Sequence, residues 1–324
     1  MGINAGGMSG GIPVVTIITP VYNEQESLPL YEKAVREVLL SRTDYKFRVL
    51  FIDDGSSDES WKEIEGICRR DPAFRGVRLS RNYGSHIALS AGFAHAGGDA
   101  VAVLACDLQD PPEVIIEFLG RWRSGAHIVW GRRRERRDEK WRVLASALFH
   151  RLLKRFAMPR GSKFQTGSFF LADGKVAECF RQFGEQNRIT FALVAWTGFE
   201  QAVVDYSRAG RVAGRSGWTF FKMIKAMYDA FIGFSLLPVR LMTAIGALSF
   251  LLTLLLSAYV ITAKIAERPV PGWTGIMLTL SVFFGIQFLL MGISGEYLYR
   301  IYAEVVRRPL YFVSETTDSP DASR

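Results

Sequence analysis

The sequence predicts an α/β domain joined to a membrane anchor, and three observations lead to that prediction. From Val14 to about Arg132, short β-branched runs alternate with amphipathic stretches, which is the rhythm of consecutive βαβ units. Polar segments follow four of these runs. Near the C-terminus lie two long segments without a charged residue. A chain of 324 residues has room for one such domain and an appendage.

Five runs are expected to form strands of one sheet: Val14–Thr19, Arg48–Ile52, Gly76–Leu79, Ala100–Leu104 and Ile128–Trp130. Helices should fill the gaps between them. The stretch Gln25–Leu40 places Leu28, Tyr31 and Val35 on one face. A second helix, Ser57–Arg69, begins with a cap signal at Ser57 and Asp58. In such sheets the ligand lies beyond the carboxyl ends of the strands, so the loops there are the first candidates for a site.

The two charge-free segments are expected to span a membrane. Leu241–Ala263 has 23 residues and Pro269–Gly295 has 27. Each can cross a hydrocarbon core of about 30 Å at about 1.5 Å per residue. The alternative is a pair of buried core helices, which the length and the lack of charge disfavour. Basic residues are more frequent outside this pair than in its short connection, so both termini and the α/β domain are expected in the cytoplasm, as part of a multi-pass protein of the inner membrane.

The expected organisation has five parts. They are a disordered leader (1–12), the α/β domain (13–217), an interfacial amphipathic helix (218–236), a transmembrane hairpin (237–298, with spans at about 241–263 and 272–297) and a cytoplasmic tail (299–324). The segment 218–236 could equally be an amphipathic helix packed on the domain. The net charge of +8 suits nucleic acid, an anionic membrane surface and a phosphorylated substrate alike, so charge does not choose among them.

The first two strand-end loops are suited to a nucleotide. Residues 19–24, Thr-Pro-Val-Tyr-Asn-Glu, open the first helix, where backbone N–H groups and an aromatic ring could hold a base and a ribose. Residues 53–58, Asp-Asp-Gly-Ser-Ser-Asp, offer acidic acceptors for uracil N–H or ribose hydroxyl groups. A helix cap with a tight turn would explain Gly55 and Ser57, but it would not explain the adjacent Asp53 and Asp54.

The next two loops add amide and carboxylate groups. Residues 81–84, Arg-Asn-Tyr-Gly, follow the third strand. Residues 107–113, Asp-Leu-Gln-Asp-Pro-Pro-Glu, follow the fourth strand and lead into a helix that starts with proline. A divalent ion that bridges a diphosphate needs only one or two protein carboxylates, because phosphate oxygens and water supply the rest. Asp107 and Gln109 are therefore candidate metal ligands.

These four motifs together resemble the family 2 glycosyltransferases. The closest branch is that of polyprenyl-phosphate glycosyltransferases, which includes enzymes similar to dolichol-phosphate mannose synthase and to bacterial undecaprenyl-phosphate glucosyl and aminoarabinosyl transferases. Residues 208–216, Arg-Ala-Gly-Arg-Val-Ala-Gly-Arg-Ser, and the segments 295–302 and 308–311 extend the likeness to this branch. The resemblance covers about residues 13 to 315.

The resemblance implies a GT-A (Rossmann-like) fold, a nucleotide-diphosphate sugar as donor, Mg²⁺ or Mn²⁺ as cofactor, and inversion at the anomeric carbon. We favour a UDP-sugar as donor and undecaprenyl phosphate as acceptor, in contact with a lipid bilayer and without any nucleic acid partner. Some relatives form tetramers, so a homo-oligomer is also compatible. The residues assigned to the nucleotide sugar are Pro20, Tyr22, Glu24, Asp53, Asp54, Asn82, Arg133 and Arg136.

Catalysis is assigned to Asp107, Asp110, Arg208 and Arg211. A lipid phosphate is already anionic, so it can attack C1 of the sugar without a strong general base, and the enzyme must supply alignment and charge neutralisation. Arg208 and Arg211 suit that task because guanidinium groups bind phosphate oxygens bidentately. With Ser216 they form the expected lipid-phosphate site. A solvated basic loop near anionic lipid is the alternative for the two arginines.

Four positions depart from the family pattern. Ala105 stands where relatives usually carry the first aspartate of Asp-x-Asp, so one expected carboxylate is missing. Ser168 and Phe170 stand where relatives tend to have Asp and Arg, in a region expected to face the sugar or the acceptor. Ser85 replaces a frequent Lys or His.

Two other functions compete with this assignment. A processive polysaccharide synthase would share the nucleotide loops, but its Gln-x-x-Arg-Trp signature and its additional spans do not occur here. A catalytically impaired lipid-binding scaffold, derived from such an enzyme, is suggested by Ala105 and Phe170.

Overall fold

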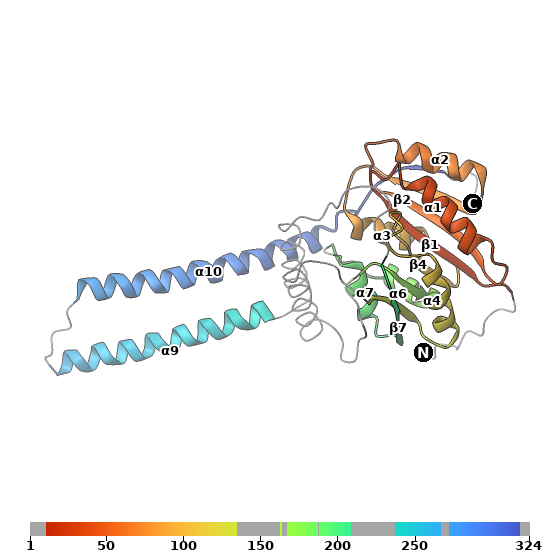
Figure 1. The fold of residues 1–324 in the computed structure, drawn as a ribbon. Helices are drawn as coiled ribbons and strands as arrows, with labels where there is room; N and C mark the ends of the chain where they lie inside the picture. The colour runs from red at the N-terminus through yellow and green to blue at the C-terminus, as the bar shows by residue number, and fades with distance from the viewer. Residues whose placement is uncertain are drawn as a thin grey trace. The chain divides into compact units, whose positions relative to one another are not determined.

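The computed structural model in Figure 1 describes residues 11–134, 163, 167–186, 188–208, 237–266 and 272–317. The chain forms two compact units, one made of residues 1–222 with 309–324 and the other of residues 223–308. Most of the expected leader 1–12 and the expected interfacial helix 218–236 lie outside the described residues.

The first unit is built on a mixed sheet of eight strands in the order β7-β5-β6-β4-β1-β2-β3-β8. The strands are β1 (Val14–Val21), β2 (Lys46–Asp53), β3 (Phe74–Leu79), β4 (Ala100–Val103), β5 (Ile128–Arg133), β6 (Phe170–Asp173), β7 (Gln201–Tyr206) and β8 (Val313–Thr316). β6 runs antiparallel to β4 and β5, and β8 runs antiparallel to β3. The other six strands point the same way, so their carboxyl ends share one edge of the sheet.

Helices cover both faces of this sheet. They are α1 (Leu28–Val35) with the π-helical turn η1 (Arg36–Leu40), α2 (Ser60–Arg70), α3 (Ser85–His95), α4 (Glu113–Arg123), α6 (Gly174–Arg181) and α7 (Thr190–Trp196). α1, α2 and α4 bury their apolar faces in one core with Ile17, Phe51 and Val129 of the sheet. On the other face α3 packs against α6, where the rings of Phe93 and Phe180 lie 4.5 Å apart. The burial of apolar area on both sides stabilises the three layers.

The five strands expected from the sequence all form. Four of them are longer than expected, by one to three residues at one end or at both, and β4 is one residue shorter. The expected helix start at Ser57 is wrong, because α2 begins at Ser60. Ser57 is engaged elsewhere: its N–H donates to Asn23 Oδ1 at 2.9 Å. Asp58 instead accepts a hydrogen bond from the Ser60 N–H at 3.0 Å, one residue closer to the helix.

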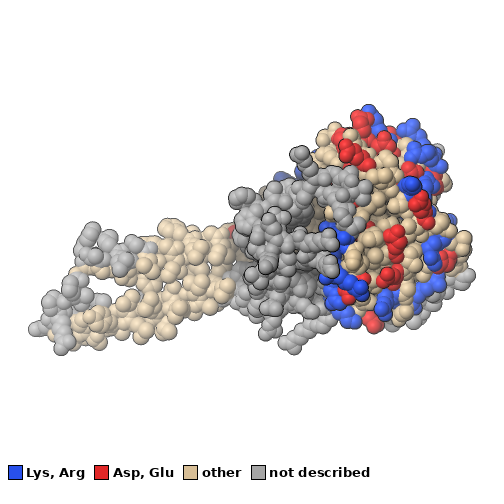
Figure 2. Space-filling view, in the orientation of Figure 1, with Lys and Arg blue, Asp and Glu red and all other residues tan. Residues whose placement is uncertain are grey.

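The second unit contains two long helices, α9 (Leu237–Ile265) and α10 (Trp273–Val306). Each contains a segment long and apolar enough to cross a membrane, Leu241–Ala263 in α9 and Val282–Val306 in α10. Neither segment is buried inside the protein, which argues against the alternative of two core helices. In Figure 2, Lys, Arg, Asp and Glu gather on the first unit, whereas the two long helices show almost uncharged described surfaces.

The second helix is longer than the expected second span. α10 continues beyond residue 297 to Val306 and ends at Arg307, whose φ is +50°. Near the start of this extension, Glu296 and Arg300 lie four residues apart and form an ion pair at 2.9 Å. The segment 299–324, expected as a tail, also supplies β8, which joins the sheet of the first unit.

Candidate active site

The loops that follow the parallel strands meet at one edge of the sheet, as the sequence predicts. They follow β1, β2, β3 and β4, and the last residues of β5 and β7 reach the same edge. Polar contacts between neighbouring loops hold this edge together, and the contacts divide it into two halves.

The first half begins with the loops after β1 and β2. Asn23 has a φ of +55°, a left-handed conformation that asparagine tolerates better than most residues. Its backbone N–H donates to Ser56 Oγ at 3.0 Å, and its side-chain oxygen accepts from the Ser57 N–H at 2.9 Å. The Glu24 N–H donates to Ser60 Oγ at 2.9 Å. Sequence analysis did not assign Asn23, Ser56 or Ser60 to the site, although all three lie within or beside the motifs.

Asp54 connects the loop after β2 to the loop after β3. Its two carboxylate oxygens accept hydrogen bonds from the backbone N–H groups of Tyr83 and Gly84, both at 2.8 Å. Burial raises the pKa of Asp54, and the two N–H groups partly oppose that rise. Gly55 makes the close approach of these loops feasible, since a Cβ there would lie 2.4 Å from the carbonyl carbon of Arg81.

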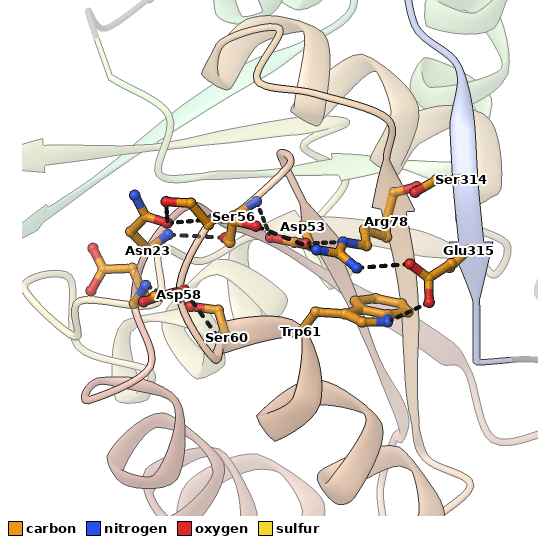
Figure 3. A network of polar contacts seen from close by, with 11 residues as sticks. Asn23, Asp53, Ser56, Asp58, Ser60, Trp61, Arg78, Ser314 and Glu315 are labelled. Carbon is orange, nitrogen blue, oxygen red and sulfur yellow. Dashed lines mark hydrogen bonds and ion pairs between the residues drawn. The ribbon is translucent and has the colours of Figure 1, made fainter.

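Asp53 is fully buried at the end of β2, beneath the same loops (Figure 3). Its Oδ1 accepts a hydrogen bond from the Ser56 N–H at 3.1 Å. Its Oδ2 lies 3.3 Å from Arg78 Nε. The two atoms are close enough for an ion pair, although Oδ2 has no aligned hydrogen bond among the described residues. Burial raises the pKa of Asp53, and the contacts with Ser56 and Arg78 oppose the rise.

The remaining residues assigned to the nucleotide differ in exposure. Tyr22 is 48% exposed and Asn82 is also exposed, so both side chains are accessible to a ligand. Pro20 lies within β1, paired with Ile52 of β2. Glu24 accepts a hydrogen bond from Ser27 Oγ at 2.6 Å, which fixes its carboxylate near the start of α1.

The loop after β4 holds the candidate metal ligands. Asp107 Oδ1 accepts a hydrogen bond from the Gln109 N–H at 3.2 Å, and Leu108 between them has a φ of +50°. The turn therefore holds the Asp107 carboxylate beside the backbone of Gln109. Burial raises the pKa of the Cys106 thiol, and the nearby carboxylates of Glu24 and Asp107 add to the rise. Within the described part of the chain, no group of three or more His, Cys, Asp or Glu residues is placed to hold a metal ion.

The second half of the edge centres on Asp110, which is buried. Tyr206, the last residue of β7, donates its hydroxyl hydrogen to Asp110 Oδ1 at 2.5 Å. Arg208 Nε lies 3.2 Å from the same oxygen. Arg133, the last residue of β5, donates to the Tyr206 hydroxyl at 3.4 Å. The structure thus brings together Asp110, Arg133 and Arg208, three residues chosen from separate motifs.

Tyr206 links these three residues, and sequence analysis missed it. Burial raises its pKa, and the adjacent Asp110 carboxylate raises it further, so the phenol stays protonated and can donate. Its position two residues before Arg208 was the available signal.

Some of the expected site residues are not part of the described site. Arg136, Arg211 and Ser216 lie outside the described residues. The region of Ser168 and Phe170 was expected to face the sugar or the acceptor, and for Phe170 this is wrong. The side chain is fully buried in β6, where its ring lies 5.0 Å from that of Trp130. The strand contains three buried residues, Phe170, Leu171 and Ala172, followed by the partly buried Asp173.

Comparison with known proteins agrees with this architecture. Residues 16–180 match glycosyl transferase family 2. An uncharacterised glycosyltransferase of Synechocystis sp. is 35% identical over 303 residues, which cover 93% of this chain and 95% of that protein. The prophage-derived bactoprenol glucosyl transferase of Shigella flexneri is 32% identical over 304 residues, with 93% and 98% of the two chains covered.

Among solved structures, the mannosyltransferase PcManGT of Pyrobaculum calidifontis, in complex with GDP-Man and Mn²⁺, is similar with a TM-score of 0.49. The two sequences are 17% identical, and the similarity covers 92% of this chain and 87% of that one. The family match and the two full-length relatives decide the assignment: the chain belongs to glycosyl transferase family 2 and is a glycosyltransferase with a GT-A-like mixed sheet.

Proposed function

We propose that the protein transfers a monosaccharide, with inversion, from a nucleotide-diphosphate sugar to the phosphate of a polyprenyl lipid at the cytoplasmic face of the membrane. We favour a UDP-sugar as donor and undecaprenyl phosphate as acceptor. An oxygen of the lipid phosphate forms the new bond to C1, and the bond from C1 to the nucleoside diphosphate breaks. The sugar is thereby transferred from the diphosphate to the lipid phosphate, and the nucleoside diphosphate is released.

The observation that carries this proposal is the contact of Arg208 with Asp110 at the strand edge. Asp110 is buried and accepts a hydrogen bond from Tyr206, so it is held in one position and in turn fixes one side of the Arg208 guanidinium. The remaining N–H groups of a guanidinium can still donate to phosphate oxygens. Arg208 is therefore suited to neutralise the negative charge of an incoming lipid phosphate, with Arg211 and Ser216 as its expected partners.

The first half of the edge is suited to the donor. Tyr22 is accessible for a ring contact with a base. Asp53 and Asp54 lie at the end of β2, and Asn82 lies in the neighbouring loop after β3. Arg133 and Arg136 are assigned to the leaving diphosphate. Two anions must meet in this reaction, and fixed positive charge at both phosphates lowers the cost of bringing them together.

A divalent cation, Mg²⁺ or Mn²⁺, fits the loop after β4. Asp107 and Gln109 offer hard oxygen donors in one turn, and a diphosphate with water would complete the shell. When bound, such an ion neutralises charge on the leaving diphosphate.

The polyprenyl acceptor is supported by the named relatives and by the long helices. The Shigella flexneri relative is called a bactoprenol glucosyl transferase, and this chain spans nearly all of it. In addition, β3 precedes both apolar helices and β8 follows them, and the two strands pair in one sheet. The two ends of the hairpin must therefore lie on the same side of a bilayer, as an even number of spans requires. With the basic residues that flank the pair, this supports a cytoplasmic location for both termini.

The purified full-length chain in detergent, supplied with undecaprenyl phosphate and radiolabelled UDP-sugars, tests the proposal. We expect a lipid-linked monosaccharide. Arg208→Ala should raise the KM for undecaprenyl phosphate about tenfold or more, because a charged contact to the phosphate is lost. Arg132→Ala is the matched control: Arg132 belongs to the same strand end as Arg133, and it forms an exposed ion pair with Asp205.

Each other result points to a different function. Polymeric product would indicate a processive synthase. Absence of product with every donor would indicate the impaired scaffold that Ala105 suggests. An equal change in acceptor KM for Arg208→Ala and Arg132→Ala would remove Arg208 from the lipid-phosphate site.

A further inference from the structure

The first half of the strand edge, which is proposed to bind the donor, is called the donor half below. The sheet beside it is completed by the C-terminal segment of the chain. β8 follows the second apolar helix and pairs antiparallel with β3, with Glu315 opposite Arg78. Two contacts at Gly76 anchor the strand, since the Gly76 N–H donates to Thr317 Oγ1 at 2.8 Å and the Thr317 N–H donates to the Gly76 carbonyl at 3.0 Å. These anchors fix the strand at one end, and Glu315 lies two residues away.

Glu315 uses both of its carboxylate oxygens to hold its neighbours (Figure 3). One oxygen accepts a hydrogen bond from Arg78 Nη1 at 2.7 Å, and the other accepts from Trp61 Nε1 at 3.0 Å. The Arg78 guanidinium also lies 5.8 Å from the centre of the Trp61 ring. Glu315 and Trp61 therefore fix the outer side of the guanidinium.

The inner side of the same guanidinium faces the donor half. Arg78 Nε lies 3.3 Å from Asp53 Oδ2, and Nη2 donates to the Ser56 carbonyl at 3.4 Å. Asp53 is fully buried, and a carboxylate in that environment is unstable without a compensating charge. Among the described residues, Arg78 supplies the ion pair of Asp53. The chain of contacts runs from β8 to β3 and on to the end of β2.

We infer that Glu315 is a positioning residue of the donor site: it holds Arg78 in the orientation that keeps Asp53 ionised at the end of β2, beneath the loops proposed to bind the nucleotide. This inference rests on the donor role proposed for Asp53. It assigns part of the donor site to a strand that the chain adds only after its membrane helices. The competing interpretation is that Glu315 only anchors β8, in which case the Arg78 contact would affect stability but not the nucleotide.

Nucleoside diphosphate binding to the full-length chain distinguishes the two interpretations. Calorimetric titration with UDP, and separately with GDP, identifies the tighter ligand, which is then used for all variants. Glu315→Gln keeps the size of the side chain and removes its charge. We expect its Kd for that nucleotide and the KM for the corresponding donor to rise about tenfold, with kcat and the acceptor KM unchanged.

Two variants supply the controls. Thr317→Val removes an anchor of β8 without touching Arg78, so it should lower thermal stability and leave nucleotide binding unchanged. The charge exchange Arg78→Glu with Glu315→Arg restores an ion pair between β3 and β8 but places a negative charge beside Asp53. We expect this double variant to keep the weakened nucleotide affinity of Glu315→Gln, because Asp53 has lost its counter-charge. If Glu315→Gln fails to fold, the charge exchange alone decides the question.

Several results would overturn the inference. They are unchanged binding by Glu315→Gln, an equal loss with Thr317→Val, and full recovery of affinity by the charge exchange. If neither nucleotide binds the wild-type chain, or if Asp53→Asn binds as tightly as wild type, the donor role of Asp53 fails and the inference fails with it. If the wild-type chain binds a nucleotide but glycosylates no polyprenyl phosphate, only the proposed function fails, because the binding measurements do not involve the acceptor.

Discussion

Tyr206 donates a hydrogen bond to Asp110 at 2.5 Å, and both side chains are buried. The contact joins the end of β7 to the loop after β4, two segments separated by almost a hundred residues. Arg208 Nε lies 3.2 Å from the same carboxylate oxygen, so this oxygen accepts the hydrogen bond of the hydroxyl and also forms an ion pair with the guanidinium. The position of Arg208 therefore depends on Tyr206.

The first prediction concerns that hydroxyl. Tyr206→Phe should lower kcat/KM for the polyprenyl acceptor about tenfold, because a buried hydrogen bond to a charged group is lost and Arg208 is less well fixed. Tyr45→Phe is the matched control, since Tyr45 is also buried but precedes β2 at the opposite edge of the sheet. Initial rates at varied acceptor concentration measure the effect. Equal losses in the two variants would mean that the Tyr206 hydroxyl affects only the fold.

The second prediction concerns the missing carboxylate. Ala105→Asp should lower the Mg²⁺ or Mn²⁺ concentration at half-maximal rate by on the order of tenfold, because affinity for hard cations rises with the number of charged ligands. Ala105→Asn controls for the added bulk and brings an oxygen without a charge. Removal of the ion by a chelator should abolish transfer by the wild-type chain. Activity that withstands the chelator would rule out the proposed metal.

The third prediction concerns Gly55. Its φ is +68°, and a Cβ there would meet the backbone of Arg81 at 2.4 Å and 2.7 Å. Gly55→Ala should therefore separate the two loops, lower the melting temperature and weaken nucleotide binding by at least tenfold, since the left-handed conformation alone costs about 1–2 kcal/mol in addition to the clash. Gly120→Ala lies in α4 with open space around its added methyl group, and it should raise stability by about 0.5–1 kcal/mol. Calorimetric melting and UDP titration of both variants measure these effects.

The fourth prediction concerns pH. Burial raises the pKa of both Asp53 and Asp54 above the ordinary value of 3.8. The folded chain therefore holds these protons more tightly than the unfolded chain does. The resulting contribution to the free energy of unfolding is fully present below pH 3.8 and is lost as the pH rises through the raised pKa values. Nucleotide binding has the opposite dependence, because the proposed contacts need the carboxylates.

Titration of the wild-type chain with UDP across the acid range checks this prediction. The Kd should increase as the pH falls, with a midpoint above the ordinary aspartate value. Asp53→Asn should bind more weakly at neutral pH and show a smaller increase on acidification. A wild-type Kd that is constant over this range would show that neither carboxylate takes part in binding.

The sequence was sufficient to predict the parallel part of the sheet. The strands from β1 to β5 are short β-branched runs with clear turns between them, and the loops that follow them converge as the topology requires. α3 carried less information. Residues 88–93 are all buried, so the helix lacks the one-sided apolar face by which amphipathic helices are recognised. Only its place between two strands indicated it.

Contacts between distant segments were the part of the site that the sequence could not supply. Asp54 was assigned to nucleotide binding, yet its carboxylate accepts hydrogen bonds from two backbone N–H groups. Because every residue except proline has a backbone N–H, the sequence does not reveal such partners. Glu315 pairs with Arg78 from 237 positions away, in a segment expected to be a tail. Neither Glu315 nor Arg78 lies in a recognised motif, and their contact follows only from the pairing of β8 with β3.

The position of β8 in the chain also sets an order of events during synthesis. β8 is the last strand to leave the ribosome, after both apolar helices have been made, and until then β3 has an open edge with unpaired backbone groups. The donor half thus acquires its final strand only once the hairpin exists. A chain halted before its hairpin is complete would lack Glu315 as well as its anchor, so a soluble fragment ending at residue 208 would be missing a piece of the sheet.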